Sequence, residues 1–162
     1  MTLTWVEAQR SHRPDLAAFS CTEPERYNQY RKQRYHPRQW ELKVERYIHT
    51  LNPPFNEPEH LMLGYDDMGL ATVAHFGLDD RQSIWMVWAL ARAFRCPGEG
   101  YGDETIENVL DTIRGHGGPQ AVMGRVHHQN DASKAMIEKY GFRRHKQVGD
   151  LEHWARPIGR VK

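Results

Sequence analysis

The chain has 162 residues, which is enough for one domain with a substantial core, and its formal charge is almost balanced at +1, with 22 Lys and Arg against 21 Asp and Glu. This balance argues against a uniformly basic nucleic-acid binder or a polybasic membrane protein. The average hides a segregated pattern, because residues 1–50 carry nine basic and six acidic side chains (net +3), residues 51–110 three and ten (net −7), and residues 111–162 ten and five (net +5).

Two helices are predicted within residues 23–50, where aromatic and aliphatic side chains recur among charged ones. His36-Pro37 divides them, because the residue before a proline avoids the α-helical region. The proline-rich stretch 52–58 then predicts a loop.

Strand patterns follow this loop. Residues 61–65 and 70–76 predict a hairpin whose turn lies at 66–69. Residues 84–91 are almost continuously apolar, which is typical of a strand buried on both faces.

The second half of the chain alternates helices and strands. A helix is predicted after residue 102 from four apolar side chains at helical spacing, namely Ile106, Val109, Leu110 and Ile113. Residues 121–126 predict a strand, a second helix runs from Asn130 to Gly141, and one or two short strands are expected within 147–158. This order predicts a mixed α/β (α+β) fold in a single domain spanning residues 1–162.

A glycine-rich loop, Gly98-x-Gly100-x-Gly102, lies between the apolar strand and the first of these helices. Glycine allows a close approach of a ligand to the backbone, and the free N–H groups at a helix N-terminus attract anions, so the loop predicts a phosphate cradle. A Walker loop is excluded because no lysine occurs between Lys43 and Lys134. A dinucleotide-binding fold is excluded because the loop follows an antiparallel hairpin. Taken alone, the loop is equally compatible with a plain connection.

A second motif follows about thirty residues later: Asn130-x-x-Ser133 opens a helix that ends in Gly141-Phe142. In this order the two motifs resemble motifs A and B of the GNAT superfamily of acyl-CoA-dependent N-acyltransferases, over roughly residues 60–145. The resemblance implies the GNAT fold, a mixed and mostly antiparallel central sheet flanked by helices. In it, two parallel strands splay apart, here residues 84–93 and 120–127.

The resemblance also implies acetyl-CoA as the cosubstrate, bound by motifs within residues 84–142. The splayed strand implies backbone contacts to the pantetheine arm from Leu90, Ala91, Arg92 and Ala93. The glycine loop implies backbone N–H contacts to the pyrophosphate from Gly98, Glu99, Gly100, Tyr101, Gly102 and Asp103. From the second helix, the resemblance implies that Asn130 and Ser133 contact the cofactor.

The chain departs from the family pattern in motif A. Aligning Gly100 and Gly102 with the last two family glycines puts Pro97 where Arg or Gln is usual. A shift by two residues would use Arg95 instead. We prefer the first register because it joins the helix without a gap, and the backbone cradle is retained under it.

The chain also lacks the family's usual acid and base. Many members carry a tyrosine seven residues after the asparagine, as general acid to the leaving thiolate, and here Ile137 stands there. Tyr140 should lie on a neighbouring helix face, so the acid role is not transferred to it. The apolar strand 84–91 has no Glu that could act as general base.

Histidines are the remaining candidates for catalysis, because aminolysis of a thioester needs an aligned, deprotonated amine and benefits from a base with a pKa near 7. His75 and His127 are the catalytic candidates, and for each a structural or solvent-exposed role is the more common alternative. His127-His128 does not have metal-site spacing, and no HExxH motif or Cys/His cluster exists, so we predict no metal. Cys96 is expected to be an inert buried thiol.

A basic, aromatic segment, residues 26–46, holds seven Lys and Arg. In the GNAT family the N-terminal helices, here 23–50, border the acceptor groove. By this resemblance the segment predicts a cationic surface at the rim of the groove that binds an anionic partner, RNA included. The alternative is a solvated helix face with its aromatics packed inward.

The sequence thus predicts an N-acetyltransferase that transfers an acetyl group from acetyl-CoA to a primary amine of unknown class, by direct attack in a ternary complex. Two alternatives stay open: a non-catalytic acyl-CoA-binding regulatory module, and a toxin-like aminoacyl-tRNA acetyltransferase. A homodimer is open as well.

The expected location is the cytoplasm, without a membrane partner. No apolar run approaches the roughly 20 residues that span a bilayer. The polar N-terminus, with Glu7 and Arg10, does not resemble a signal peptide. Cys21 and Cys96 form no disulfide framework.

Overall fold

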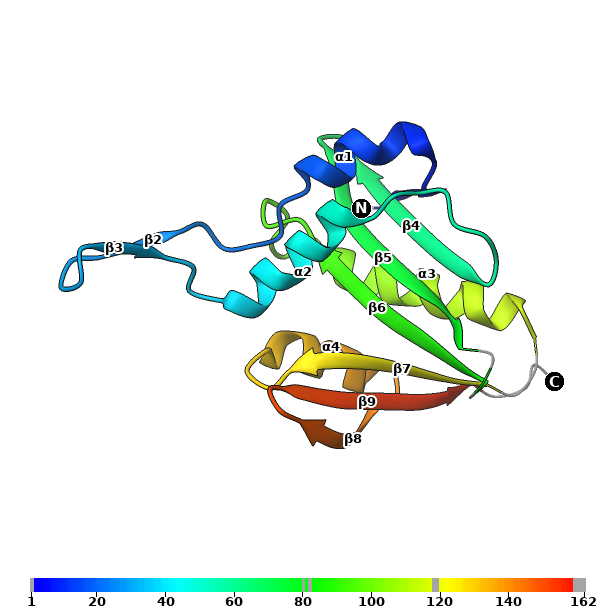
Figure 1. The fold of residues 1–162 in the computed structure, drawn as a ribbon. Helices are drawn as coiled ribbons and strands as arrows, with labels where there is room; N and C mark the ends of the chain where they lie inside the picture. Colours follow the sequence, from blue (N-terminus) through cyan, green and yellow to red (C-terminus); the bar gives the residue numbers. More distant parts are fainter. Residues whose placement is uncertain (1, 80, 82, 118–119, 159–162) are drawn as a thin grey trace.

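A seven-stranded sheet with the order β1-β4-β5-β6-β7-β9-β8 forms the centre of the computed structural model, which describes residues 2–79, 81, 83–117 and 120–158 (Figure 1). Its strands are β1 (Thr4–Glu7), β4 (Glu59–Asp66), β5 (Gly69–Asp79), β6 (Ile84–Arg92), β7 (Gln120–His127), β8 (Arg143–Val148) and β9 (Leu151–Ile158). The helices are η1 (Arg10–His12), α1 (Arg13–Ala18), α2 (Gln39–Thr50), α3 (Tyr101–Gly115) and α4 (Asp131–Lys139). β2 (Arg26–Asn28) and β3 (Gln33–Tyr35) form a separate two-stranded ribbon.

The sheet is mixed and mostly antiparallel, as predicted. Only β6 and β7 pair in parallel, and the other neighbours in the sheet are antiparallel. The predicted hairpin is β4–β5, whose turn contains Gly69 at φ +123°, a backbone angle that favours glycine.

Helices cover both faces of the sheet, α1 and α2 on one and α3 and α4 on the other (Figure 1). Alternation along β5 supplies both cores: Ala71 and Val73 pack in the cluster under α1 and α2, whereas Ala74 and Phe76 pack in the cluster with α3. The two clusters hold the sheet between the helix layers by burial of apolar surface on both sides.

The closing strands are longer than predicted. β8 already begins at Arg143, directly after the Gly141-Phe142 turn, and β9 lies between β7 and β8 in the sheet. The side chains of β8 are exposed throughout, so the apolar pattern that marks a strand is missing there.

The prediction of a helix at the start of residues 23–50 was wrong. Residues 26–35 form the β2–β3 hairpin, which extends away from the sheet, and only α2 is helical (Figure 1). The Asn28 side chain accepts hydrogen bonds from the N–H groups of Tyr30 (2.9 Å) and Arg31 (3.1 Å), and Lys32 has a left-handed φ of 51°. Hydrogen bonds within the turn therefore determine the structure of residues 26–35. A helix here would have no neighbouring layer to pack against among the described residues, and packing supplies most of the stability of a helix.

No helix in the described ranges is both long enough and apolar enough to cross a bilayer.

Candidate functional site

The parallel strands β6 and β7 separate partway along their length. Their register pairs run only from Ile84–Ala121 to Val87–Gly124, although both strands continue beyond this point. Opposite β5, Val87 pairs with Phe76 and Ala89 with His75, so Trp88 forms a bulge without a register partner. A bulge bends and twists its strand, which accounts for the separation. The splayed strands that the sequence implied are thus present.

A cavity of about 550 Å³ opens where the strands separate. β6 contributes Met86, Val87, Trp88, Ala89 and Leu90, and β7 and the following turn contribute Gly124 to His127 and Asn130. Helix α2 closes one side with Trp40, Lys43, Val44 and Tyr47, spaced along one face of the helix. The predicted strand 84–91 is therefore not buried on both faces, because part of its apolar surface lines this cavity.

The glycine loop leads into α3 in the expected way. Gly98 and Gly100 have φ of +73° and +74°, and nothing lies within 4 Å of a Cβ added at either position. Gly100 is the N-cap of α3, and the first intrahelical bond runs from Glu104 N to Gly100 O. The N–H groups of the first turn therefore lack intrahelical partners. The space beside Gly98 and Gly100 is open, whereas Gly102, in the first turn, packs against Met136.

Asp66 fixes this loop from the β4–β5 turn. Its carboxylate accepts hydrogen bonds from both terminal nitrogens of Arg95 (2.8 and 2.9 Å) and from the Tyr101 hydroxyl (3.2 Å). The bonds from Arg95 hold the pKa of Asp66 at about 2. Because Arg95 is held in this ion pair, the backbone of the loop is better placed than the Arg95 side chain to receive a phosphate.

The remaining sequence-predicted binding residues fall into two groups. Leu90, Asn130 and Ser133 line the cavity, and the Asn130 side chain also caps α4 by accepting from Ser133 N (3.2 Å). Ala91 and Ala93 have side chains buried in the core under α1 and α2, so only their backbone could serve a ligand. The backbone of Ala93 is already engaged, because its N–H donates to Ala71 O (2.7 Å) and its C=O accepts from Cys96 N (3.1 Å). Arg92, Gly98, Glu99 and Gly100 are exposed, Tyr101 is buried, and Gly102 and Asp103 are partly buried in the first turn of α3.

Ile137 lines the cavity at the position where a general acid was sought, and its side chain carries no proton to donate. Tyr140 lies outside the lining residues and donates its hydroxyl to Glu107 (2.8 Å). Neither residue supplies an acid to the cavity.

His75 is connected to the cavity through a tyrosine. Its Nδ1 lies 2.7 Å from the hydroxyl of Tyr47, and its Nε2 lies 2.7 Å from the Glu59 carboxylate. Because a carboxylate only accepts, Nε2 carries the proton and Nδ1 accepts from Tyr47. Burial lowers the pKa of His75, against the opposing effect of Glu59, so the ring is neutral at pH 7. Glu59–His75–Tyr47 therefore forms a hydrogen-bonded chain that ends at the cavity wall.

The sequence interpretation missed Tyr47 and Glu59 as functional residues. Tyr47 was counted with the apolar residues of a helix, and Glu59 lies two residues before the predicted strand 61–65. The spacing of Tyr47, Glu59 and His75 along the chain carries no signal, since α2 and the two strands meet only in the folded protein.

His127 lines the cavity directly. Its ring stacks on Trp40 with centroids 4.5 Å apart and planes 12° apart, and its Nδ1 accepts from Gln129 N. Burial, followed by the neighbouring His128, lowers the pKa of His127. The stacked ring closes the cavity between α2 and β7.

Cys96 is 2% exposed, and burial raises the pKa of its thiol. A buried, protonated thiol is a poor nucleophile, which agrees with an inert role.

The residues present fit an acyl-CoA. The slot between β6 and β7 offers unpaired strand edges to an amide-containing arm, and the left-handed glycines leave the first turn of α3 open to phosphate. The walls of the cavity at the slot are largely apolar, as the acyl end requires.

Comparisons with known proteins agree with this geometry. A profile of the acetyltransferase (GNAT) domain matches residues 2–143. An acetyltransferase of the GNAT family from Streptococcus pneumoniae has a similar structure, with a TM-score of 0.67 and 14% identity over 97% of this chain and 99% of that one. The ribosomal-protein-S18-alanine N-acetyltransferase from Escherichia coli has a TM-score of 0.67 and 15% identity, over 99% of this chain and 96% of that one. Mutant forms of the spermidine/spermine N-acetyltransferase from Vibrio cholerae have a TM-score of 0.64 and 15% identity, over 96% of this chain and 94% of that one. At these identities the likeness concerns the fold, and none of the curated protein sequences matches significantly.

Proposed function

Because the chain belongs to the acetyltransferase (GNAT) family and is therefore an acyltransferase, we propose that it transfers an acetyl group from acetyl-CoA to a primary amine by direct attack in a ternary complex. The observation that carries this proposal is the cavity at the strand separation, which is lined by the hydrogen-bonded Tyr47 on α2 and by Ile106 on α3, the helix that begins at the glycine loop. A single domain for residues 1–162 remains our expectation.

The chain's own groups suffice to bind the cosubstrate. The free edge of β6 from Leu90 to Arg92 would pair with the pantetheine amides, whereas the Ala93 N–H already donates to Ala71 O (2.7 Å). The N–H groups from Gly98 to Asp103 would hold the pyrophosphate. Asn130 and Ser133 would contact the same ligand from the start of α4. When bound, acetyl-CoA supplies an activated acyl carbon and a thiolate leaving group.

Tyr47 is the group we assign to the acceptor amine. As the amine nitrogen bonds to the acyl carbon and the carbon–sulfur bond breaks, the amine gives a proton to the Tyr47 oxygen while the Tyr47 proton passes to Nδ1 of His75. The resulting imidazolium is stabilised by the Glu59 carboxylate. Burial and Glu59 raise the pKa of Tyr47, so the hydroxyl stays protonated and acts as a relay.

Binding of the cosubstrate is the first test. Acetyl-CoA at 100 times its Kd is expected to raise the Tm by about 5–10 °C, because a ligand that binds only the folded state stabilises it. Scanning fluorimetry with acetyl-CoA measures the shift, and pantetheine, which lacks the pyrophosphate, serves as the weaker control. An unchanged Tm at millimolar acetyl-CoA contradicts the proposal.

Catalysis is the second part of this test. With a panel of primary amines, release of free thiol from acetyl-CoA is expected for at least one acceptor class. Tight binding of acetyl-CoA with no thiol release across the panel would favour the alternative of a non-catalytic regulatory module.

The β2–β3 hairpin favours a second, narrower candidate, an anionic acceptor such as aminoacyl-tRNA. Tyr27, Tyr30 and Tyr35 are 58%, 99% and 43% exposed, so the aromatics do not pack inward. Arg31, Lys32 and Arg34 have no carboxylate partner within ion-pair distance in the part of the chain that the structure describes. Exposed aromatic rings interleaved with free cations are suited to stack on bases and contact phosphates.

The triple variant Arg31→Ala, Lys32→Ala, Arg34→Ala tests this surface. It is expected to weaken binding of fluorescent aminoacyl-tRNA by about 10-fold or more and to flatten the salt dependence, measured by fluorescence anisotropy. The matched control removes three cations of β8, namely Arg143, Arg144 and Lys146. Equal binding by both variants and the wild type would restrict the acceptor to amines without a polyanion.

The cytoplasm remains the expected location, and the buried free thiols of Cys21 and Cys96 suit a reducing compartment.

A further inference from the structure

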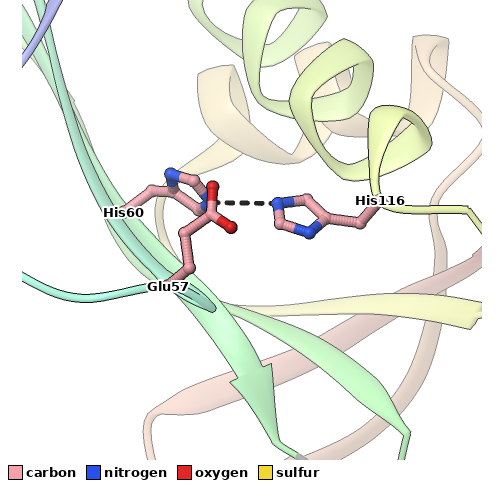
Figure 2. A group of neighbouring side chains, drawn as sticks. All are labelled: Glu57, His60 and His116. Carbon is pink, nitrogen blue, oxygen red and sulfur yellow. Dashed lines mark hydrogen bonds between the residues drawn. The ribbon is translucent and has the colours of Figure 1, made fainter.

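A second cluster of titratable side chains lies at the end of α3 remote from the glycine loop. His116 directly follows α3, His60 is the second residue of β4, and Glu57 lies in the loop before it. Figure 2 shows the three side chains turned toward one another, and their ligand atoms all lie within 4.8 Å of each other. The helix separates this cluster from the cradle by roughly 20 Å.

His60 is the fixed member of the cluster. It is 5% exposed, its ring stacks on Phe76 with centroids 5.2 Å apart, and its Nδ1 donates to the carboxylate of Glu7. With the proton on Nδ1, the Nε2 of His60 presents a lone pair to the cluster. A carboxylate behind a histidine is the arrangement that orients metal-bound imidazoles and raises their basicity.

The Nε2 atoms of His60 and His116 lie 3.1 Å apart. Two zinc–nitrogen bonds of about 2.0–2.1 Å would meet at an angle of about 100° across this separation, which is close to tetrahedral. Glu57 is exposed, so its carboxylate can turn to supply the third ligand.

We propose that Glu57, His60 and His116 form a Zn²⁺ site, with Glu7 orienting His60 from behind. Two imidazoles and one carboxylate favour Zn²⁺ over Mg²⁺ or Ca²⁺, which prefer all-oxygen ligands. The metal replaces the hydrogen bond between the two histidines. Our sequence expectation of no metal rested on linear motifs, and 56 residues separate the two histidines.

The site is structural, independent of acetyl transfer. It connects the loop before β4 and the start of β4 to the residue that follows α3, and a cation at a helix C-terminus interacts favourably with the helix dipole. Zinc is therefore expected to stabilise the fold and to leave acetyl-CoA binding unchanged.

Another group, His127, His128 and Asp150, has the same residue types within the same distance. There the two imidazoles stack with centroids 4.6 Å apart and planes 27° apart, and Nδ1 of His127 accepts from Gln129 N. Stacked rings do not converge on one point, and two of these residues belong to the cavity region. This group is the matched control rather than a second proposal.

The experiment titrates ZnCl₂ into the tag-free, EDTA-treated full chain by calorimetry and follows the Tm. One Zn²⁺ per chain is expected to bind and, at 100 times its Kd, to raise the Tm by about 5–10 °C, whereas MgCl₂ has no effect. His116→Asn is expected to weaken binding at least 100-fold, and Glu7→Gln about 10-fold. His128→Asn is expected to bind zinc like the wild type.

Absence of zinc binding overturns the proposal, and so does binding that His128→Asn abolishes and His116→Asn leaves intact. His116 is exposed, and the Tm of the metal-free variant reports whether it folds. Should it not fold, Glu57→Gln takes its place, with an expected loss of at least 10-fold in zinc affinity. The readout is independent of acetyl transfer, so an inactive protein with a zinc site would still support this proposal.

Discussion

Tyr47→Phe is expected to lower kcat/KM for acetyl transfer by about 10²-fold while leaving the Kd of acetyl-CoA unchanged. The substitution keeps the ring that lines the cavity and removes only the hydroxyl that bonds to His75, the group that the proposed relay assigns to the acceptor amine. Proton transfer by a positioned group contributes about 10²–10⁴-fold to the rate. We expect a loss at the lower end of this range because the variant still aligns the amine with the acyl carbon. Steady-state kinetics together with calorimetry of acetyl-CoA binding measure both quantities.

Tyr65→Phe is the matched control for this experiment. Tyr65 also donates its hydroxyl to a side chain, Asp15 Oδ2 at 2.7 Å, but it does not line the cavity. Its loss should change stability and leave kcat/KM within about twofold. Equal activity of Tyr47→Phe and the wild type would remove Tyr47 from the mechanism.

The pH profile separates a relay from a merely structural tyrosine. The relay needs neutral His75, and burial lowers the pKa of this ring below its ordinary value of 6.5. The kcat/KM of the wild type is therefore expected to be constant near pH 7 and to fall only as pH drops through that lowered pKa. In Tyr47→Phe this acidic limb should disappear, because His75 no longer exchanges a proton with the cavity. An unchanged limb in the variant would assign it to another group.

Gly100→Val is expected to weaken acetyl-CoA binding by about 100-fold. Gly100 caps α3 at φ +74°, a conformation that a β-branched residue adopts only with strain. The strain moves the loop and turns the first N–H groups of α3 away from the position where they would hold a pyrophosphate. Calorimetry with acetyl-CoA gives the Kd.

Gly117→Val controls for the strain itself. Gly117 has φ +75°, nothing lies within 4 Å of a Cβ added there, and it follows the other end of the same helix. Both variants should lose a similar amount of stability, but only Gly100→Val should lose affinity. A similar loss of affinity in both would mean that the loop contributes no specific contact.

The sequence predicted the parts of the protein whose structure is determined locally. The glycines at 98, 100 and 102, the Asn130 cap and the apolar stripe of α3 each act through neighbours within a few residues, so a linear pattern reveals them. The order of these elements predicted a mixed α/β fold, and the resemblance to the GNAT family implied the mostly antiparallel sheet and the splayed strands. Family membership followed from the same two motifs.

The sequence could not predict contacts that join distant segments. The chain from Glu59 through His75 to Tyr47 requires α2, β4 and β5 to meet, and the histidine cluster requires β4 to meet the end of α3. The hairpin at residues 26–35 failed for a different reason. There a periodic pattern of aromatics was interpreted as a buried helix face, although these side chains have no core beside them.

Only four residue pairs, from Ile84–Ala121 to Val87–Gly124, connect the two parts of the sheet, β1-β4-β5-β6 and β7-β9-β8. The width of the opening between the two parts therefore depends on the angle at which these pairs hold them. Gly124 lies in the last of these pairs, and a Cβ added there would meet the side chain of Val87 only at 4.0 Å. Gly124 and Val87 both line the cavity, so the residues that hold the two parts of the sheet together also form part of its wall. A larger side chain at position 124 is therefore expected to change both the opening between β6 and β7 and the space inside it.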